Sequence, residues 1–223
     1  MRLSFWKAVQ QLESYYGSPT PPITRDPFEL VLYENIAYLV SDDRREKAFR
    51  ELKKRVGLRP ADVLTASLES LAEITGIGGI FPELRARRLQ ESARLVRDQF
   101  GGNLKRVLAL DAAEARKSLK KFPVIGEPGA DKILLLTGTV PSLAPESNGL
   151  RVLVRLGFVQ EHKNYSTMYR AAQVALQDEY GKDCGALIAA HQLLKRHGQE
   201  LCRRSAPRCE ACPLRKTCPS ASV

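Results

Sequence analysis

The sequence predicts an all-α fold, because apolar residues recur at helical spacing and strand-like alternation is nowhere sustained. The first apolar stripe is Phe5, Val9, Leu12 and Tyr16, which would lie on one face of a helix. Proline, glycine and helix-capping residues separate this stripe from those that follow. A chain of 223 residues punctuated in this way has room for about ten helices.

The remaining helices can be placed in chain order. After a proline-rich linker, Asp26 is a typical N-cap and Pro27 suits the first helical position, so a second helix is expected over residues 28–40. The segment from Leu201 onward has no apolar stripe, and we expect it to be irregular. Further stripes predict helices over residues 41–57, 61–64, 68–74, 89–100, 111–119, 128–136, 150–156, 168–180 and 187–197.

The composition is that of a globular protein with a polyanionic partner. Apolar residues make up 43% of the chain, and 35 Lys and Arg against 25 Asp and Glu give a net charge of +10. This balance favours DNA, RNA or an acidic membrane surface. No apolar run approaches the roughly 20 residues of a membrane span, and the N-terminus lacks the apolar core of a signal peptide. We therefore expect a cytoplasmic protein without a membrane partner, whose thiols stay reduced.

Four of the five cysteines are gathered near the C-terminus. Cys202, Cys209, Cys212 and Cys218 follow the pattern C-x6-C-x2-C-x5-C, in a segment with too few apolar residues to fold alone. Two ligand sets fit: a zinc ion held by four thiolates, or an iron–sulfur cluster held by the same four. General spacing rules do not separate the two.

The cysteine spacing resembles that of the 4Fe–4S loop in the endonuclease III class of helix–hairpin–helix DNA glycosylases. His197-Gly198, three residues and then Cys202 resemble the pattern H-G-x-x-x-C of the same class. The resemblance implies a mainly structural 4Fe–4S cluster that shapes a basic loop in contact with DNA. Within this loop, it places Arg203, Arg204 and Arg208 on DNA phosphates.

The segment 122–126, Phe-Pro-Val-Ile-Gly, resembles the hairpin of the same class, usually written L-P-G-V-G. In such a hairpin a tight turn leads into a helix N-terminus, whose free N–H groups hold a phosphate. The resemblance therefore places Val124 and Gly126 at DNA, together with Lys120 and Lys121 just before the turn. Val124 replaces one of the usual glycines, so the turn is expected to differ there.

Two positions bear on catalysis. Bifunctional members of the class carry a lysine two residues after the second hairpin glycine, which forms a Schiff base with the sugar. The matching residue is Pro128, which has no amine, so we expect no such lyase activity. Glu146 stands where the adenine and mismatch branch has its aspartate, at the start of a segment that resembles D-G-N-V-x-R-V-L-x-R. A carboxylate there would stabilise a cationic sugar, whereas the alternative is an exposed glutamate favoured by the helix dipole.

Glu34 is the second candidate carboxylate. It lies inside the apolar run Leu30–Val40, where burial would raise its pKa and suit it as a general acid. The run P-F-E-L-V-L-Y-E-N resembles the adenine and mismatch branch, where a glutamate at this position acts on the extruded base. The alternative is a structural glutamate paired with an arginine across the core. Tyr38 could stack in the gap left by that base, or pack in the core.

Taken together, these resemblances imply a two-lobed, endonuclease III-like protein. Residues 24–140 would form a helical lobe with the hairpin, and residues 1–23 and 141–223 an iron–sulfur lobe with the cluster loop at 202–218. We expect a monomeric, monofunctional DNA glycosylase of the nucleoid that acts on a damaged or mismatched base in double-stranded DNA. The alternative is a catalytically impaired paralogue that only binds abasic or mismatched DNA.

Overall fold

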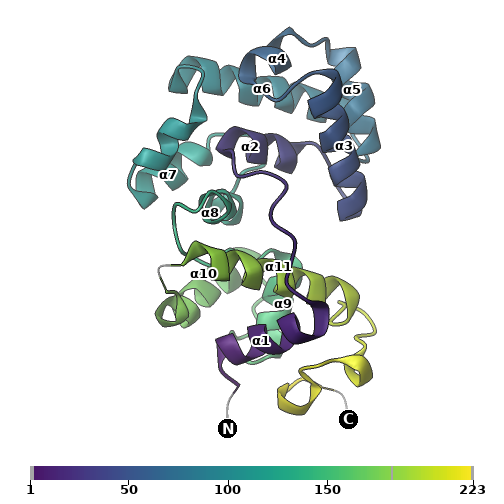
Figure 1. Ribbon diagram of the computed structural model, residues 1–223, viewed down its shortest axis with the longest axis vertical. Coiled ribbons are helices and arrows are strands. Elements are labelled where there is room, and N and C mark those ends of the chain that lie inside the picture. The colour runs from purple at the N-terminus through teal and green to yellow at the C-terminus, as the bar shows by residue number, and fades with distance from the viewer. Residues whose placement is uncertain (1–2, 182, 222–223) are drawn as a thin grey trace. The chain divides into compact units, whose positions relative to one another are not determined.

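The computed structural model describes residues 3–181 and 183–221, and within these ranges it contains helices and no strand (Figure 1). The predicted all-α class is confirmed. The chain divides into two compact units. We call Pro22–Thr137 the central unit, and the segments up to Pro21 and from Gly138 onward the terminal unit. None of the helices in the described ranges is both long and apolar enough to cross a membrane.

The central unit is built around α6, which packs against α2, α4 and α5. The loops supply the expected capping residues: the Asp26 side chain accepts hydrogen bonds from the backbone N–H groups of Phe28 and Glu29 at the start of α2. The side chains of Ser41, Ser67 and Asp111 cap later helices in the same way. The helices of this unit are α2 (Pro27–Asn35), α3 (Asp42–Arg55), α4 (Pro60–Thr65), α5 (Leu68–Ile77), α6 (Pro82–Phe100), the 3-10 helix η1 (Leu104–Ala109), α7 (Ala112–Leu119) and α8 (Glu127–Leu136).

Helix α2 ends at Asn35, five residues before the end that the apolar run predicts. The cause is a set of hydrogen bonds to residues in other parts of the central unit. The guanidinium of Arg85 on α6 donates a hydrogen bond of 2.7 Å to the carbonyl oxygen of Ile36, and the backbone N–H of Tyr38 donates to Gly78 at 2.9 Å rather than back along the helix. Residues 36–41 therefore form a loop, which turns sharply at Leu39.

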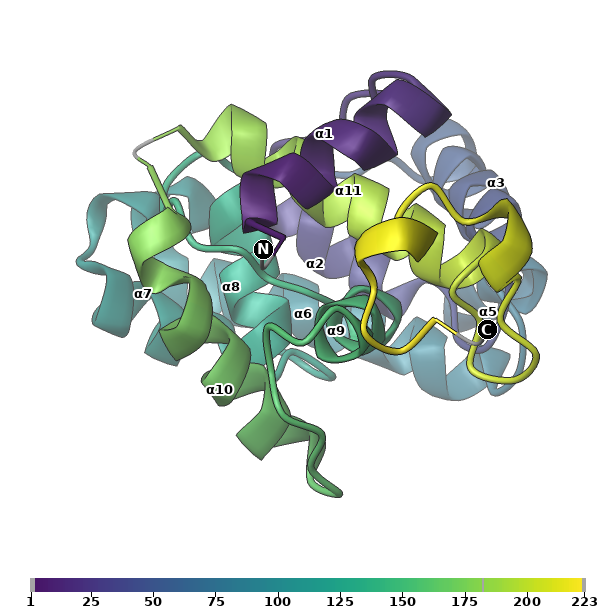
Figure 2. The same cartoon turned by 90° about the horizontal axis from the view of Figure 1, so that it is seen from below.

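The terminal unit is built around α11, which packs against α1 and α9 (Figure 2). The approach of α11 to α9 is close: a Cβ atom added at Gly198 would lie 2.6 Å from the carbonyl oxygen of Asn148. The C-terminal segment continues from the end of α11 as a loop with two short 3-10 helices. The helices of this unit are α1 (Phe5–Tyr16), α9 (Ser147–Arg155), α10 (Tyr165–Leu176), η2 (Gln177–Glu179), α11 (Cys184–Glu200), η3 (Cys209–Ala211) and η4 (Arg215–Thr217).

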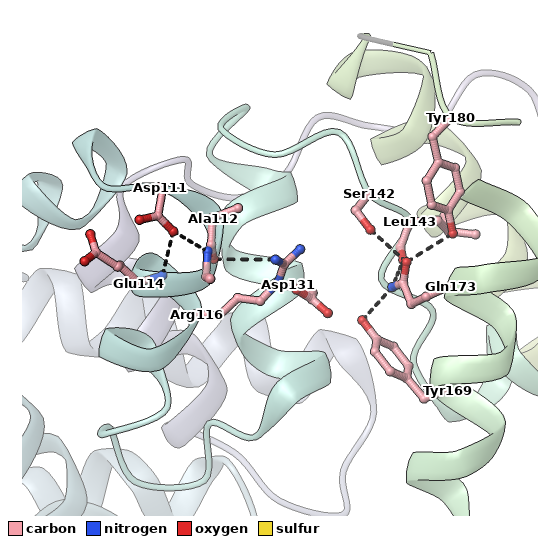
Figure 3. Close-up of polar contacts among 11 residues, drawn as sticks. Asp111, Ala112, Glu114, Arg116, Asp131, Ser142, Leu143, Tyr169, Gln173 and Tyr180 are labelled. Atoms are coloured by element: carbon pink, nitrogen blue, oxygen red, sulfur yellow. Dashed lines mark hydrogen bonds and ion pairs between the residues drawn. The ribbon is translucent and has the colours of Figure 1, made fainter. Parts of the chain in front are cut away.

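A polar network holds the connector that leads into α9 (Figure 3). Gln173 on α10 donates from its amide to the carbonyl oxygen of Leu143, and its amide oxygen accepts from the hydroxyl of Ser142 at 2.7 Å. The hydroxyls of Tyr169 and Tyr180 complete the network around the same side chain. The connector is therefore fixed immediately before the candidate residue Glu146.

Candidate functional site

The hairpin between α7 and α8 is fixed from two sides. Arg116 on α7 forms an ion pair with the buried Asp131 on α8 (Figure 3), and the amide of Asn35 donates to the carbonyl oxygen of Pro123 at 3.2 Å. Helix α8 follows its N-cap Gly126, which provides no side-chain cap, and a helix N-terminus of this kind can hold an anion. The four residues predicted to contact DNA here, Lys120, Lys121, Val124 and Gly126, are all exposed.

Glu34 is half-buried rather than buried, and its partner is a lysine. The Nζ atom of Lys132 lies 2.7 Å from Glu34 Oε2, with the two side chains 20% and 21% exposed. Lys132 lies on α8, one helical turn after Pro128. An ammonium at this distance stabilises the carboxylate anion.

Glu34 lines a pocket of about 390 Å³ within the central unit. The rest of the lining mixes aromatic, apolar and basic side chains, among them Tyr38 and Phe81. Asn35 also lines it; its side chain is buried, and its Oδ1 atom has no hydrogen-bond partner in the part of the chain that the structure describes. A pocket with aromatic walls, a carboxylate and an open amide acceptor can hold a flat, hydrogen-bonding group.

Glu146 is the N-cap of α9, and both of its oxygens accept hydrogen bonds. Oε1 accepts from the backbone N–H of Gly149, and Oε2 from the amide of Asn148, both at 2.9 Å. These donors are neutral, so they stabilise the anion without cancelling its charge. Tyr165 lies nearby: its hydroxyl donates to the carbonyl oxygen of Pro145, and burial together with the charge of Glu146 raises the pKa of Tyr165 to about 12.

Arg151 links the setting of Glu146 to the cysteine-rich loop. Its guanidinium donates to Asn148 Oδ1 at 2.8 Å, to the carbonyl oxygen of Gly198 at 2.7 Å and to that of Cys202 at 2.9 Å. Asn148 in turn donates to Glu146. A continuous chain of hydrogen bonds therefore runs from the backbone of Cys202, through Arg151 and Asn148, to the carboxylate of Glu146.

The four cysteines of the C-terminal loop line a cavity of about 260 Å³. Within the described ranges, no group of three or more His, Cys, Asp or Glu side chains is close enough to hold one metal ion. A single zinc ion would need all four sulfurs about 2.3 Å from one point. The four sulfur donors are of the type that holds either a zinc ion or an iron–sulfur cluster.

Two side chains direct N–H groups at this cavity. Arg155 Nη1 lies 3.4 Å from the sulfur of Cys202, and His197 Nε2 lies 3.6 Å from that of Cys212. Burial lowers the pKa of His197 to about 4, so the ring is neutral near pH 7. Its Nδ1 atom lies 3.1 Å from the hydroxyl of Tyr16. If Tyr16 donates there, Nε2 carries the proton and donates to the sulfur, which stabilises a thiolate.

The basic residues of the cysteine loop face solvent. Arg203, Arg204 and Arg208 are all exposed. Arg155 also donates to the backbone carbonyl oxygens of Arg203 and Arg204, at 2.6 and 3.2 Å, so the loop backbone is held while the two side chains remain outside. The arrangement can present cations to a phosphate backbone.

Several of these contacts were not predicted from the sequence. The pairing of Lys132 with Glu34 had no local signal, because the two residues lie far apart in the chain. Asn148 and Arg151 could have been found, since they lie on the same short helix as their partner Glu146. The role of Arg85 in ending α2 had no local signal, because Ile36, whose carbonyl oxygen accepts from it, lies in another part of the chain.

Comparisons with known proteins agree with this architecture. No family model matches the chain. It is 24% identical over 193 residues to endonuclease III of Thermotoga maritima, covering 86% of this chain and 83% of that protein. It is 25% identical over 216 residues to a putative DNA repair glycosylase of Methanocaldococcus jannaschii, covering 96% and 94%.

Solved structures are similar over nearly the whole chain. A trapped covalent intermediate of endonuclease III with DNA superposes with a TM-score of 0.77 at 22% identity, covering 98% of this chain and 97% of that one. A thermostable thymine-DNA glycosylase superposes with a TM-score of 0.75 at 18% identity, covering 97% and 96%. The fold is thus endonuclease III-like.

Proposed function

We propose that this protein is a monofunctional DNA glycosylase, which hydrolyses the bond between a damaged or mismatched base and its sugar in double-stranded DNA. The observation that carries the proposal is the setting of Glu146: an anion held by two neutral donors at a helix N-terminus. Such an anion can stabilise the positive charge that develops on the sugar as the base departs. The protein would act as a monomer in the nucleoid.

The reaction divides between the two carboxylates. The extruded base enters the pocket beside Glu34, and Glu34 is the proposed general acid that protonates it. The base leaves with the electrons of the broken bond, and water adds to the sugar cation and releases a proton, which gives an abasic site. Glu146 of the terminal unit is the proposed anion that stabilises the cation. Pro128 offers no amine, so no Schiff base forms at that position and the DNA strand stays intact.

We also propose that Cys202, Cys209, Cys212 and Cys218 hold a 4Fe–4S cluster. The cavity between the sulfurs and the donors from Arg155 and His197 support it. When bound, the cluster would cross-link a loop that has little apolar core, and so hold its arginines toward phosphate. A brown preparation with about four iron and four sulfide per chain is expected. A colourless preparation that contains one zinc per chain would establish the zinc alternative instead.

The test of activity is single-turnover base release from duplexes that contain G·T, G·U, A·8-oxoguanine, thymine glycol, hypoxanthine or an alkylated purine. We expect strand breaks only after alkali, and a loss of at least about a hundredfold in Glu146→Gln and Glu34→Gln. Glu161→Gln is the matched control, because this exposed glutamate of the terminal unit has no part in the proposed site. Strand cleavage without alkali, trapped by borohydride, would overturn the monofunctional assignment.

The second candidate function is a non-enzymatic protein that binds abasic or mismatched DNA. It is favoured by the fact that both carboxylates already have structural partners: Glu146 caps α9 and Glu34 pairs with Lys132. The same panel decides between the two functions. No release from any duplex, together with tight binding to abasic DNA, would establish the binding protein.

A further inference from the structure

The charges that line the pocket beside Glu34 do not balance. Among the described residues, Glu34 is the acidic member of the lining, and the Lys132 ammonium already lies 2.7 Å from its carboxylate. Arg85 and Arg88 on α6 are the basic members of the lining. Because Lys132 neutralises Glu34, the two guanidiniums leave the pocket with an excess of positive charge.

The hydrogen-bond partners of Arg85 are neutral. Its guanidinium is buried and donates to the backbone carbonyl oxygens of Ile36 and Gly79. These acceptors hold the side chain in place without cancelling its charge. Its third nitrogen, Nε, has no hydrogen-bond partner in the part of the chain that the structure describes. A buried N–H group without an acceptor costs free energy, so a ligand with a carbonyl oxygen matches this site better than one with a further donor.

Other arginines add to the positive potential around Arg85. Burial lowers the pKa of Arg85, and the charges of Arg45, Arg44 and Arg88 lower it further. The guanidiniums of Arg44 and Arg45 both donate to backbone carbonyl oxygens, which are neutral. An arginine keeps its charge despite such a shift, because its ordinary pKa lies far above neutral pH. The pocket therefore lies in a positive local field.

A base with a positive charge would be repelled from this pocket. The rings of Tyr38 and Phe81 also line it and would attract a cation. They are 52% and 60% exposed, however, and the attraction of a cation to an exposed ring is several times weaker than the repulsion between two full charges near a protein surface. A neutral base meets no such repulsion, and its carbonyl oxygens can accept hydrogen bonds from the guanidiniums.

We propose that Arg85 and Arg88 act as a charge filter: the pocket admits neutral bases that carry carbonyl oxygens and excludes bases that N-alkylation has made cationic. This inference rests on the proposed function, which places the extruded base in this pocket, and it narrows the substrate to an uncharged base. It also fits the role proposed for Glu34. A neutral base needs a proton to become a good leaving group, whereas a cationic base already carries the charge.

The test compares pairs of bases that differ in charge and in little else. At neutral pH 3-methyluracil is uncharged and 3-methylcytosine is cationic, and the two differ at one exocyclic position, where the first has a carbonyl oxygen and the second an amino group. The purines 1-methylhypoxanthine and 1-methyladenine form the same kind of pair. N-methylation blocks Watson–Crick pairing in all four bases, so the cost of extrusion is similar within each pair. A 2′-fluoroarabino sugar keeps the base attached during the measurement.

The quantity measured is Kd for each of these duplexes and for an undamaged duplex. For the unaltered protein we expect both neutral members to bind more tightly than undamaged duplex, and more tightly than their cationic partners by at least about tenfold. Arg88→Glu should bring the two Kd values of each pair within about threefold, because it replaces a repelling charge with an attracting one. Arg88→Gln removes the charge and keeps a polar side chain, so its ratio should lie between these two.

Arg94→Glu is the matched control, since Arg94 is an exposed arginine of the same helix outside the pocket lining. It should weaken binding to every duplex alike and leave the ratio within each pair unchanged. Cationic members that bind as tightly as the neutral ones, or neutral members that bind no more tightly than undamaged duplex, would overturn the proposal. A ratio that Arg88→Glu and Arg94→Glu change equally would overturn it too. The proposed function fails separately, when no base in the release panel is removed, because the binding measurement needs no release.

Discussion

The carboxylate of Glu146 accepts hydrogen bonds from Asn148 and Gly149 of the helix that it caps. The carboxylate of Glu34 pairs instead with an ammonium from a helix almost a hundred residues away in the sequence. In the first arrangement the groups in contact with the carboxylate are neutral, and the Arg151 cation lies one hydrogen bond further away, at Asn148. In the second arrangement a cation contacts the carboxylate directly, so the pair is neutral overall. Two glutamates in one chain can thus serve different steps because their partners differ in charge.

The largest expected effect comes from breaking the link that supports Glu146. Arg151→Ala would leave three acceptors without their donor: the amide oxygen of Asn148 and the carbonyl oxygens of Gly198 and Cys202. Since unmade hydrogen bonds to buried acceptors are costly, we expect the free energy of unfolding to fall by about 3 kcal/mol. Urea unfolding measures this, with Lys163→Ala on an exposed loop of the same unit as control.

Base release should fall further in Arg151→Ala than the loss of folded protein explains, because Asn148 would no longer be held against Glu146. Asn148→Ala separates the two effects. It removes the donor to Glu146 and keeps the bonds from Arg151 to Gly198 and Cys202. Unchanged release in both variants would show that Glu146 does not depend on this chain of hydrogen bonds.

The same contrast explains what the sequence could predict. The helices follow from apolar spacing and capping residues, which are local, and the all-α class is confirmed. The setting of Glu146 is also local, because its donors lie two and three residues further along the chain. The end of α2 at Asn35 and the pairing of Glu34 with Lys132 depend on residues far away in sequence. An apolar run gives no sign of such contacts, which is why it predicts a longer helix and a buried glutamate.

An intermediate effect is expected from Lys132→Met. It leaves the half-buried Glu34 carboxylate without its cation, which should cost about 1–2 kcal/mol of unfolding free energy. The double variant with Glu34→Gln should be less destabilised than the sum of the two single variants, since the unpaired charge is gone. Thermal unfolding of all four proteins gives this coupling, and the exposed Lys117→Met on α7 is the control. Strictly additive effects would show that the interaction between Glu34 and Lys132 contributes nothing to the free energy of unfolding.

The smallest effect concerns Tyr165, beside Glu146. Its pKa is raised from 10.0 to about 12, first by burial and then by the charge of Glu146. The folded state therefore keeps a proton that the unfolded state loses first, so this contribution to stability is complete below pH 10 and disappears as the pH rises to about 12. Tyr165→Phe has no proton to lose, and its stability relative to the unaltered protein should rise across this window. Urea unfolding at pH 9 and near pH 11 measures the difference, and Tyr15→Phe on an exposed side chain is the control. A difference that does not change with pH would mean that neither burial nor the charge of Glu146 holds the proton on Tyr165 in the folded state.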